Sequence, residues 1–151
     1  MAKQRLQELD SKNLIEQNRI KLYYVELTDI VRSFIEREMK IPALESTTDE
    51  LIETITDFNT SSKLNIPEET LKKLQRLLQE ADLVKFAKMK PLLNEIELHR
   101  RDAETVIDVI HPAQMAKARR DEEEERKLIE AEKEKEKKIL EKETQATNNN
   151  S

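Results

Sequence analysis

The sequence predicts an all-α protein, a compact bundle of four to five helices with a charged C-terminal helical extension. Glycine is absent from the 151 residues, which removes the usual residue for primed hairpin turns and phosphate-cradling loops. Apolar residues recur at spacings of three and four over most of residues 20–110, as they do on one face of a helix. From residue 117 to 143 nearly every residue is charged, which favours a solvated helix without a core-facing stripe.

Four regions are expected along the chain. Residues 1–18 form an N-terminal helix or linker, residues 19–112 the helical bundle domain, residues 113–143 the charged helical extension, and residues 144–151 a disordered tail. A chain of this length can hold one ordinary domain, and a compact part of that size buries roughly two-thirds of its extended-chain surface. The tail has three asparagines and no apolar anchor, so it lacks the surface that would offset the entropy of ordering.

The clearest helix spans residues 20–40, after a weakly amphipathic helix at residues 3–17 and a break at Asn18. Its apolar stripe is formed by Ile20, Tyr24, Leu27, Val31 and Phe34. The charged residues of the opposite face are expected to lie in water: Arg32, Glu36 and Arg37. Consecutive residues are rotated by about 100° around a helix, so either Tyr23 or Tyr24 is expected to face away from the core, as a rim contact or a partner anchor.

Local signals mark the next connections. Pro42 ends the preceding helix near Lys40, because proline cannot supply the amide that would continue it. Thr47 and Glu50 have the spacing of a capping box at the start of a short helix. Residues 59–65 are rich in Asn, Thr and Ser, whose side chains compete for backbone hydrogen bonds, and they predict a mobile surface loop.

The second half of the bundle is predicted to contain two longer helices. Pro67, followed by Glu68 and Glu69, opens the first, because proline and negative charge both suit a first helical turn. Asp82 is expected to cap a further short turn. Pro91 is expected to start a long helix that closes the folded part at residues 111–112.

Composition argues against several classes of protein. Without cysteine there is no disulfide framework and no thiolate ligand, which fits a reducing cytoplasm. The net charge of -5 and the few aromatic residues argue against a general nucleic-acid binder. The longest apolar runs are far shorter than the ~20 residues that cross a bilayer, so the chain as given is expected to be soluble.

No residue is predicted to be catalytic, to bind a cofactor or to ligate a metal. His99 lies in register between Ile96 and Ala103, so a buried or boundary position on the long helix is expected. The other histidine, His111, is about 18 Å further along a continuous helix, too far to share a metal ion with His99. Serines and threonines cluster in turns without a glycine elbow. We therefore predict no enzymatic activity and no cofactor.

One group of basic residues is a candidate interaction patch: Lys85, Lys88, Lys90, Arg100 and Arg101. Such a patch would suit phosphate, anionic lipid or the acidic face of a partner. The alternative interpretation is that these are ordinary solvated side chains whose stems cover apolar surface. The patch leaves open a second function, an adaptor that binds anionic lipid or nucleic acid, although nucleic acid is not favoured by the net charge.

Three motifs occur in one order: the tyrosine pair with LTDIVR in residues 23–32, IPALESTTDEL in residues 41–51, and ADLVKFAK in residues 81–88. Together they resemble the cytoplasmic helical region that follows a transmembrane helix in BatD-like membrane proteins of bacterial aerotolerance operons, and related domains of unknown function. The resemblance spans about residues 12–110. The family usually has an aromatic residue and a glycine before the isoleucine that corresponds to Ile41, where this chain has Met39 and Lys40, so the glycine cap is lost.

The resemblance implies a cytoplasmic domain, tethered to the inner membrane through a segment absent from this chain. It also implies protein partners among the products of the same operon, without a small-molecule substrate and without catalytic residues. We therefore predict a non-enzymatic protein-interaction or scaffolding domain on the cytoplasmic side of a membrane protein.

Overall fold

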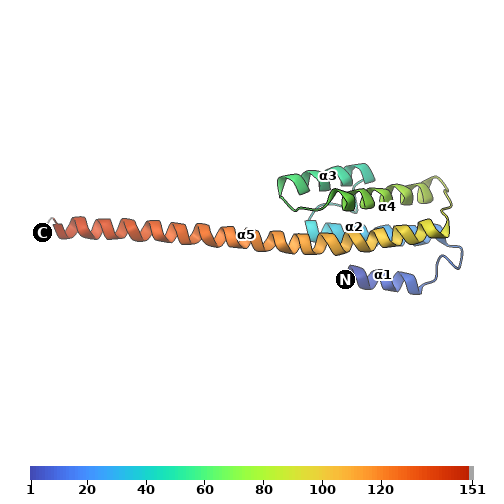
Figure 1. The fold of residues 1–151 in the computed structure, drawn as a ribbon, viewed down its shortest axis with the longest axis horizontal. Helices are drawn as coiled ribbons and strands as arrows, with labels where there is room; N and C mark the ends of the chain where they lie inside the picture. Colours follow the sequence, from blue (N-terminus) through green and yellow to red (C-terminus); the bar gives the residue numbers. More distant parts are fainter. Residues whose placement is uncertain (150–151) are drawn as a thin grey trace. The chain divides into compact units, whose positions relative to one another are not determined.

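A computed structural model describes residues 1–149, which form five helices and contain no strand. The helices are α1 (Ala2–Ser11), α2 (Ile20–Met39), α3 (Thr48–Ser61), α4 (Glu68–Phe86) and α5 (Leu93–Asn149) (Figure 1). The all-α prediction is confirmed. The chain divides into two compact units, Met1–Gln114 and the residues from Met115 onward, so the first unit closes two residues beyond the predicted limit. Pro112 lies inside α5 and does not end it.

The core of the first unit is organised around α2, which packs against α1 and α4, while α3 packs against α4. The part of α5 in this unit is bonded to α2 by the Tyr24 hydroxyl, 2.6 Å from His99 Nδ1. Burying a large apolar side chain contributes about 1.5–3 kcal/mol, so the shared core is the main source of stability. Every helix of this unit contributes fully buried side chains, among them Leu6, Leu9, Leu27, Leu51, Leu74 and Ile110. Residues 1–18 thus belong to the bundle and are not a linker.

The start of α3 is the predicted capping box. The Glu50 amide donates to the Thr47 hydroxyl at 3.2 Å, and the Thr47 amide donates to the Glu50 carboxylate at 3.3 Å. Two amides that the first helical turn would leave unpaired are thereby satisfied. The prediction from local spacing is confirmed.

At the end of α2, Lys40 occupies the position that commonly carries glycine. Its backbone is left-handed, with φ 56° and ψ 43°, and its amide donates to the Glu36 carbonyl at 2.9 Å. A side chain with a β-carbon in this conformation costs on the order of 1 kcal/mol. The neighbouring Met39 is buried in the core, so packing holds the chain end in place despite the strain.

Two predicted connections differ from the structure. Helix α3 continues to Ser61, and the segment that follows is anchored, because Leu64 and Ile66 are buried and the Asn59 side chain bonds to both the amide and the carbonyl of Ile66. The prediction of a loop at residues 59–65 was therefore wrong for residues 59–61, which are helical, whereas residues 62–65 lie in the connector between α3 and α4. Asp82 lies within α4 and caps no separate turn.

The second unit is the continuation of α5 from residue 115. Its apolar residues Leu128, Ile129, Ile139 and Leu140 are exposed, as expected for a helix without a core stripe. Lys117 pairs with Asp121 at 2.6 Å, one turn away. Helix α5 continues to Asn149 and so runs into the segment, residues 144–151, that is predicted to be disordered. Residues 150–151 lie outside the described residues. Across the described residues, no helix combines the length and the apolar character needed to cross a membrane.

Candidate functional site

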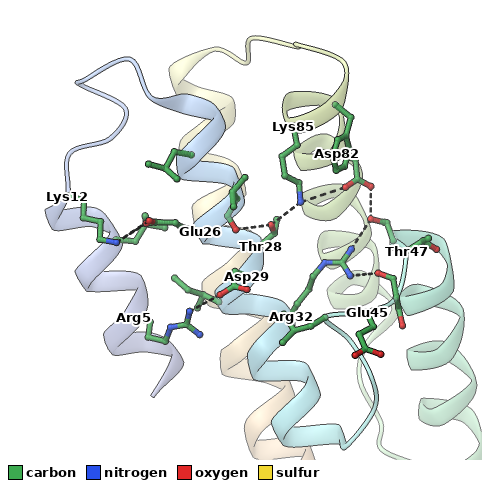
Figure 2. Close-up of a pocket in the computed structure, with 18 of the residues that line it drawn as sticks. Arg5, Lys12, Glu26, Thr28, Asp29, Arg32, Glu45, Thr47, Asp82 and Lys85 are labelled. Carbon is green, nitrogen blue, oxygen red and sulfur yellow. Dashed lines mark hydrogen bonds and ion pairs between the residues drawn. The ribbon is translucent and has the colours of Figure 1, made fainter.

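A cavity of about 860 Å³ opens between α1, α2, the connector at residues 41–47 and the end of α4; we call it the cleft (Figure 2). Three local features position the walls of the cleft. Leu9 buries α1 against α2, the left-handed Lys40 turns the connector back over α2, and α3 begins at its capping box. The wall formed by α1 comes from residues 1–18, which were predicted to be a helix or linker.

The floor of the cleft is built around Arg32, which was predicted to face water but is only 8% exposed. Its guanidinium donates to the carbonyls of Ala43 at 2.8 Å and Ser46 at 2.7 Å, and to the Thr48 hydroxyl at 3.2 Å. The Thr48 hydroxyl in turn donates to the Asp82 carboxylate at 2.6 Å. One cation from α2 thus fixes the connector and links it to α3 and α4, and burial lowers the pKa of Arg32.

Lys85 completes the polar floor from α4, as Figure 2 shows. Its amine donates to the Thr28 hydroxyl at 3.2 Å and lies 3.9 Å from the Asp82 carboxylate. Burial lowers the pKa of Lys85, and the nearby Asp82 carboxylate opposes this effect. The Thr28 hydroxyl donates to the Tyr24 carbonyl at 2.8 Å, one turn earlier in α2. Lys85 is therefore held between two helices.

Two ion pairs join α1 to α2 along the opposite side of the cleft. Arg5 lies 3.0 Å from Asp29, and Lys12 lies 3.0 Å from Glu26. Both pairs are partly exposed, so each contributes only about 0–1 kcal/mol to stability. Their main consequence is that these charges are bonded to each other at the cleft wall.

The rim of the cleft is apolar where the floor is polar. Val25 and Leu44 line the opening with 41% and 44% of their surface exposed, and Phe86 lies at its edge. Leu22 adds a partly buried side chain beside Val25. Single exposed apolar residues are ordinary, but several around one concave surface indicate a binding surface.

The five residues of the predicted basic patch do not form one surface. Lys85 lies in the cleft, whereas Arg100 and Arg101 line a different cavity of about 580 Å³. Arg100 pairs with Asp10 at 2.8 Å and with Glu104 at 3.0 Å, and the hydrogen bond to Asp10 raises its pKa. Its charge is thereby committed to holding α1 against α5. The remaining two, Lys88 and Lys90, are exposed in the connection between α4 and α5.

Three further buried titratable side chains, those of His99, Tyr23 and Tyr24, do not line the cleft. His99 is buried, as predicted, and burial lowers its pKa. The prediction that one tyrosine faces outward was wrong: Tyr23 and Tyr24 are both buried, because helices pack on two sides of α2. Burial raises the pKa of Tyr23 to about 12. Within residues 1–149 no group of three or more His, Asp or Glu side chains is placed to hold a metal ion.

Sequence reasoning missed the residues that organise this interior. Asp102, on the buried side of α5, accepts two hydrogen bonds from Arg76, at 2.7 and 3.0 Å. The sequence held a signal for Arg32 and Asp102, since Arg32 lies three residues before the apolar Ile35 and Asp102 four residues before the apolar Val106. A charged residue in register with a stripe indicates a buried, paired charge as readily as a boundary of the core.

Comparison of the chain with protein-family models, curated proteins and solved structures finds no match. The likeness to the BatD-like cytoplasmic region therefore stays a prediction based on the three motifs.

Proposed function

We propose that this chain is a non-enzymatic protein-interaction or scaffolding domain and that its partner binds over the cleft. One observation supports the proposal above others: the polar groups of the floor are bonded to one another, while the apolar rim is exposed. A general acid or base must be directed at a substrate. The carboxylates of Glu26, Asp29 and Asp82 instead face arginine, lysine or threonine of this chain.

Acidic residues at the rim favour a partner that carries positive charge. Glu8 and Glu45 are exposed and line the same opening as Val25 and Leu44. An apolar side chain flanked by lysine or arginine would bury the rim and meet these carboxylates. We therefore propose a protein segment of that composition as the occupant. The location on the cytoplasmic side of a membrane protein rests on the motif resemblance alone.

Site-specific cross-linking tests the proposal in the native cell. A photoreactive residue is placed at Val25 or Leu44, and in matched controls at Glu53 of α3 or Gln79 of α4, which are exposed away from the cleft. We expect one protein species to be captured from both rim positions and from neither control. Leu44→Asp, combined with the probe at Val25, should lower the yield by about tenfold or more, because a rim anchor becomes charged. Equal capture from the control positions, or no effect of Leu44→Asp, would refute the proposal.

A further inference from the structure

A second apolar surface lies at the connection between α4 and α5. Phe86 ends α4, Leu92 precedes α5 and Leu93 begins it, and their side chains are 80%, 66% and 62% exposed. We call these three residues, together with Lys88 and Lys90, the α4–α5 edge. So many large apolar side chains exposed within eight residues mark a surface that meets an apolar phase or a partner.

The exposure does not come from a loose chain. The Met89 amide donates to the Leu83 carbonyl at 3.1 Å, and Met89 packs against the core. Pro91 is buried. The Leu92 amide donates to the Glu95 carboxylate at 3.2 Å, which caps the start of α5. The backbone is therefore held at both ends of the connection, and the apolar side chains are exposed on an anchored segment.

The connection itself carries positive charge. Residues 83–94 contain three lysines and no acidic residue. Lys88 and Lys90 are exposed, whereas Lys85 is turned into the cleft. The two carboxylates that flank this segment in the sequence are engaged within the chain, Asp82 with Thr48 and Glu95 with the cap of α5. The edge thus combines exposed phenyl and leucyl groups with two exposed ammonium groups, and Phe86 is the residue that it shares with the edge of the cleft.

From this arrangement we infer that the α4–α5 edge binds the surface of an anionic lipid bilayer. The three apolar side chains enter the boundary between headgroups and acyl chains, and the two lysines contact the anionic headgroups. A single-stranded nucleic acid would instead require a basic groove with aromatic residues on which successive bases stack, and the edge has one phenyl ring among aliphatic leucines. The inference goes beyond the proposed function, because none of the four residues 88, 90, 92 and 93 lines the cleft.

The size of the edge sets the strength of binding. Each lysine close to an anionic surface strengthens binding by about fivefold. Two lysines and three partly inserted side chains give weak, reversible attachment of the kind a single acyl chain provides. Binding this weak would set the orientation of this protein on the membrane, while a second contact keeps it there.

Vesicle cosedimentation of the full chain tests the inference. Vesicles of phosphatidylcholine with about 30% phosphatidylserine should bind the chain, pure phosphatidylcholine much less, and binding should weaken when the salt rises from about 0.05 to 0.5 M. Lys88→Gln with Lys90→Gln should weaken binding roughly 30-fold. Leu92→Ser with Leu93→Ser should weaken it by about tenfold or more.

Matched controls come from the second unit, which offers the same residue types in exposed positions. Leu128→Ser with Leu140→Ser, and Lys133→Gln with Lys137→Gln, should leave binding unchanged. Near-ultraviolet circular dichroism of each variant verifies the fold. Three results would overturn the inference: no binding to the anionic vesicles, equal binding by edge and control variants, or tighter binding to a single-stranded oligonucleotide than to vesicles. Cross-linking from Val25 should persist in the Leu92 and Leu93 variant, so the two proposals can fail separately.

Discussion

Replacing Arg32 with methionine tests whether one buried cation holds the connector to the bundle. The change removes three charge-assisted hydrogen bonds, two of them to the carbonyls of Ala43 and Ser46. Each such bond contributes roughly 1.5–3 kcal/mol, and a buried carbonyl left without a donor adds a desolvation penalty. Methionine regains some apolar packing and avoids burying a charge. The net loss should therefore be about 3–5 kcal/mol.

Urea unfolding followed by near-ultraviolet circular dichroism measures this loss. Both tyrosines of the chain lie in α2, so the signal reports the first unit without the charged extension. With a denaturant slope of about 1.5 kcal/mol per molar urea, the midpoint should fall by roughly 2–3 M. If Arg32→Met does not fold, Thr48→Val removes the link from Arg32 to Asp82 and should cost about 1–2 kcal/mol.

The control is Arg37→Met, an equal change at an exposed position of the same helix. It should alter stability by no more than about 0.5 kcal/mol. Equal midpoints for the Arg32 and Arg37 variants would show that the network contributes no more than a surface arginine, and the reasoning on the buried cation would have to be abandoned.

Two further predictions follow from the backbone and from burial. Lys40→Gly should raise the unfolding free energy by up to about 1 kcal/mol, because glycine adopts the left-handed end of α2 without strain; an unchanged or lower thermal midpoint would contradict this. Because burial lowers the pKa of His99 in the folded chain, the unfolded chain binds more protons once the pH falls below about 6.5. The free energy of unfolding should then decrease by up to about 1.4 kcal/mol per pH unit as the pH falls further. His99→Gln should lose this part of the pH dependence. Identical profiles of stability against pH for the original chain and the His99→Gln variant would contradict the prediction.

The local signals predicted most of the helix framework because their causes are local. The capping box at Thr47 satisfies amides within one turn, and Pro67 opens α4 from the first residue before it. The same locality explains the wrong predictions. Pro112 was predicted to end the folded part, which is within two residues of the end of the first unit, but it does not break α5. Asp82 was read as a cap, but it serves as an acceptor for Thr48 of another helix.

The candidate site needed the tertiary structure. Whether Arg32 meets water or three oxygen acceptors depends on where the connector and α3 lie, and no spacing within α2 reports that. The predicted basic patch was wrong for the same reason. Arg100 is bonded to Asp10, which lies ninety residues away in the chain, so its sequence neighbours do not report this contact.

The sequence by itself determined that this chain is helical, because the period of its apolar residues and its caps act over one or two turns. Only the tertiary structure decided which polar groups are buried and which apolar groups remain outside. Tyr23 is buried because α2 is covered on two sides, whereas Leu92, an apolar residue just before α5, remains 66% exposed. Burial is a property of neighbours brought together from distant parts of the chain, and the cleft and the α4–α5 edge both follow from it.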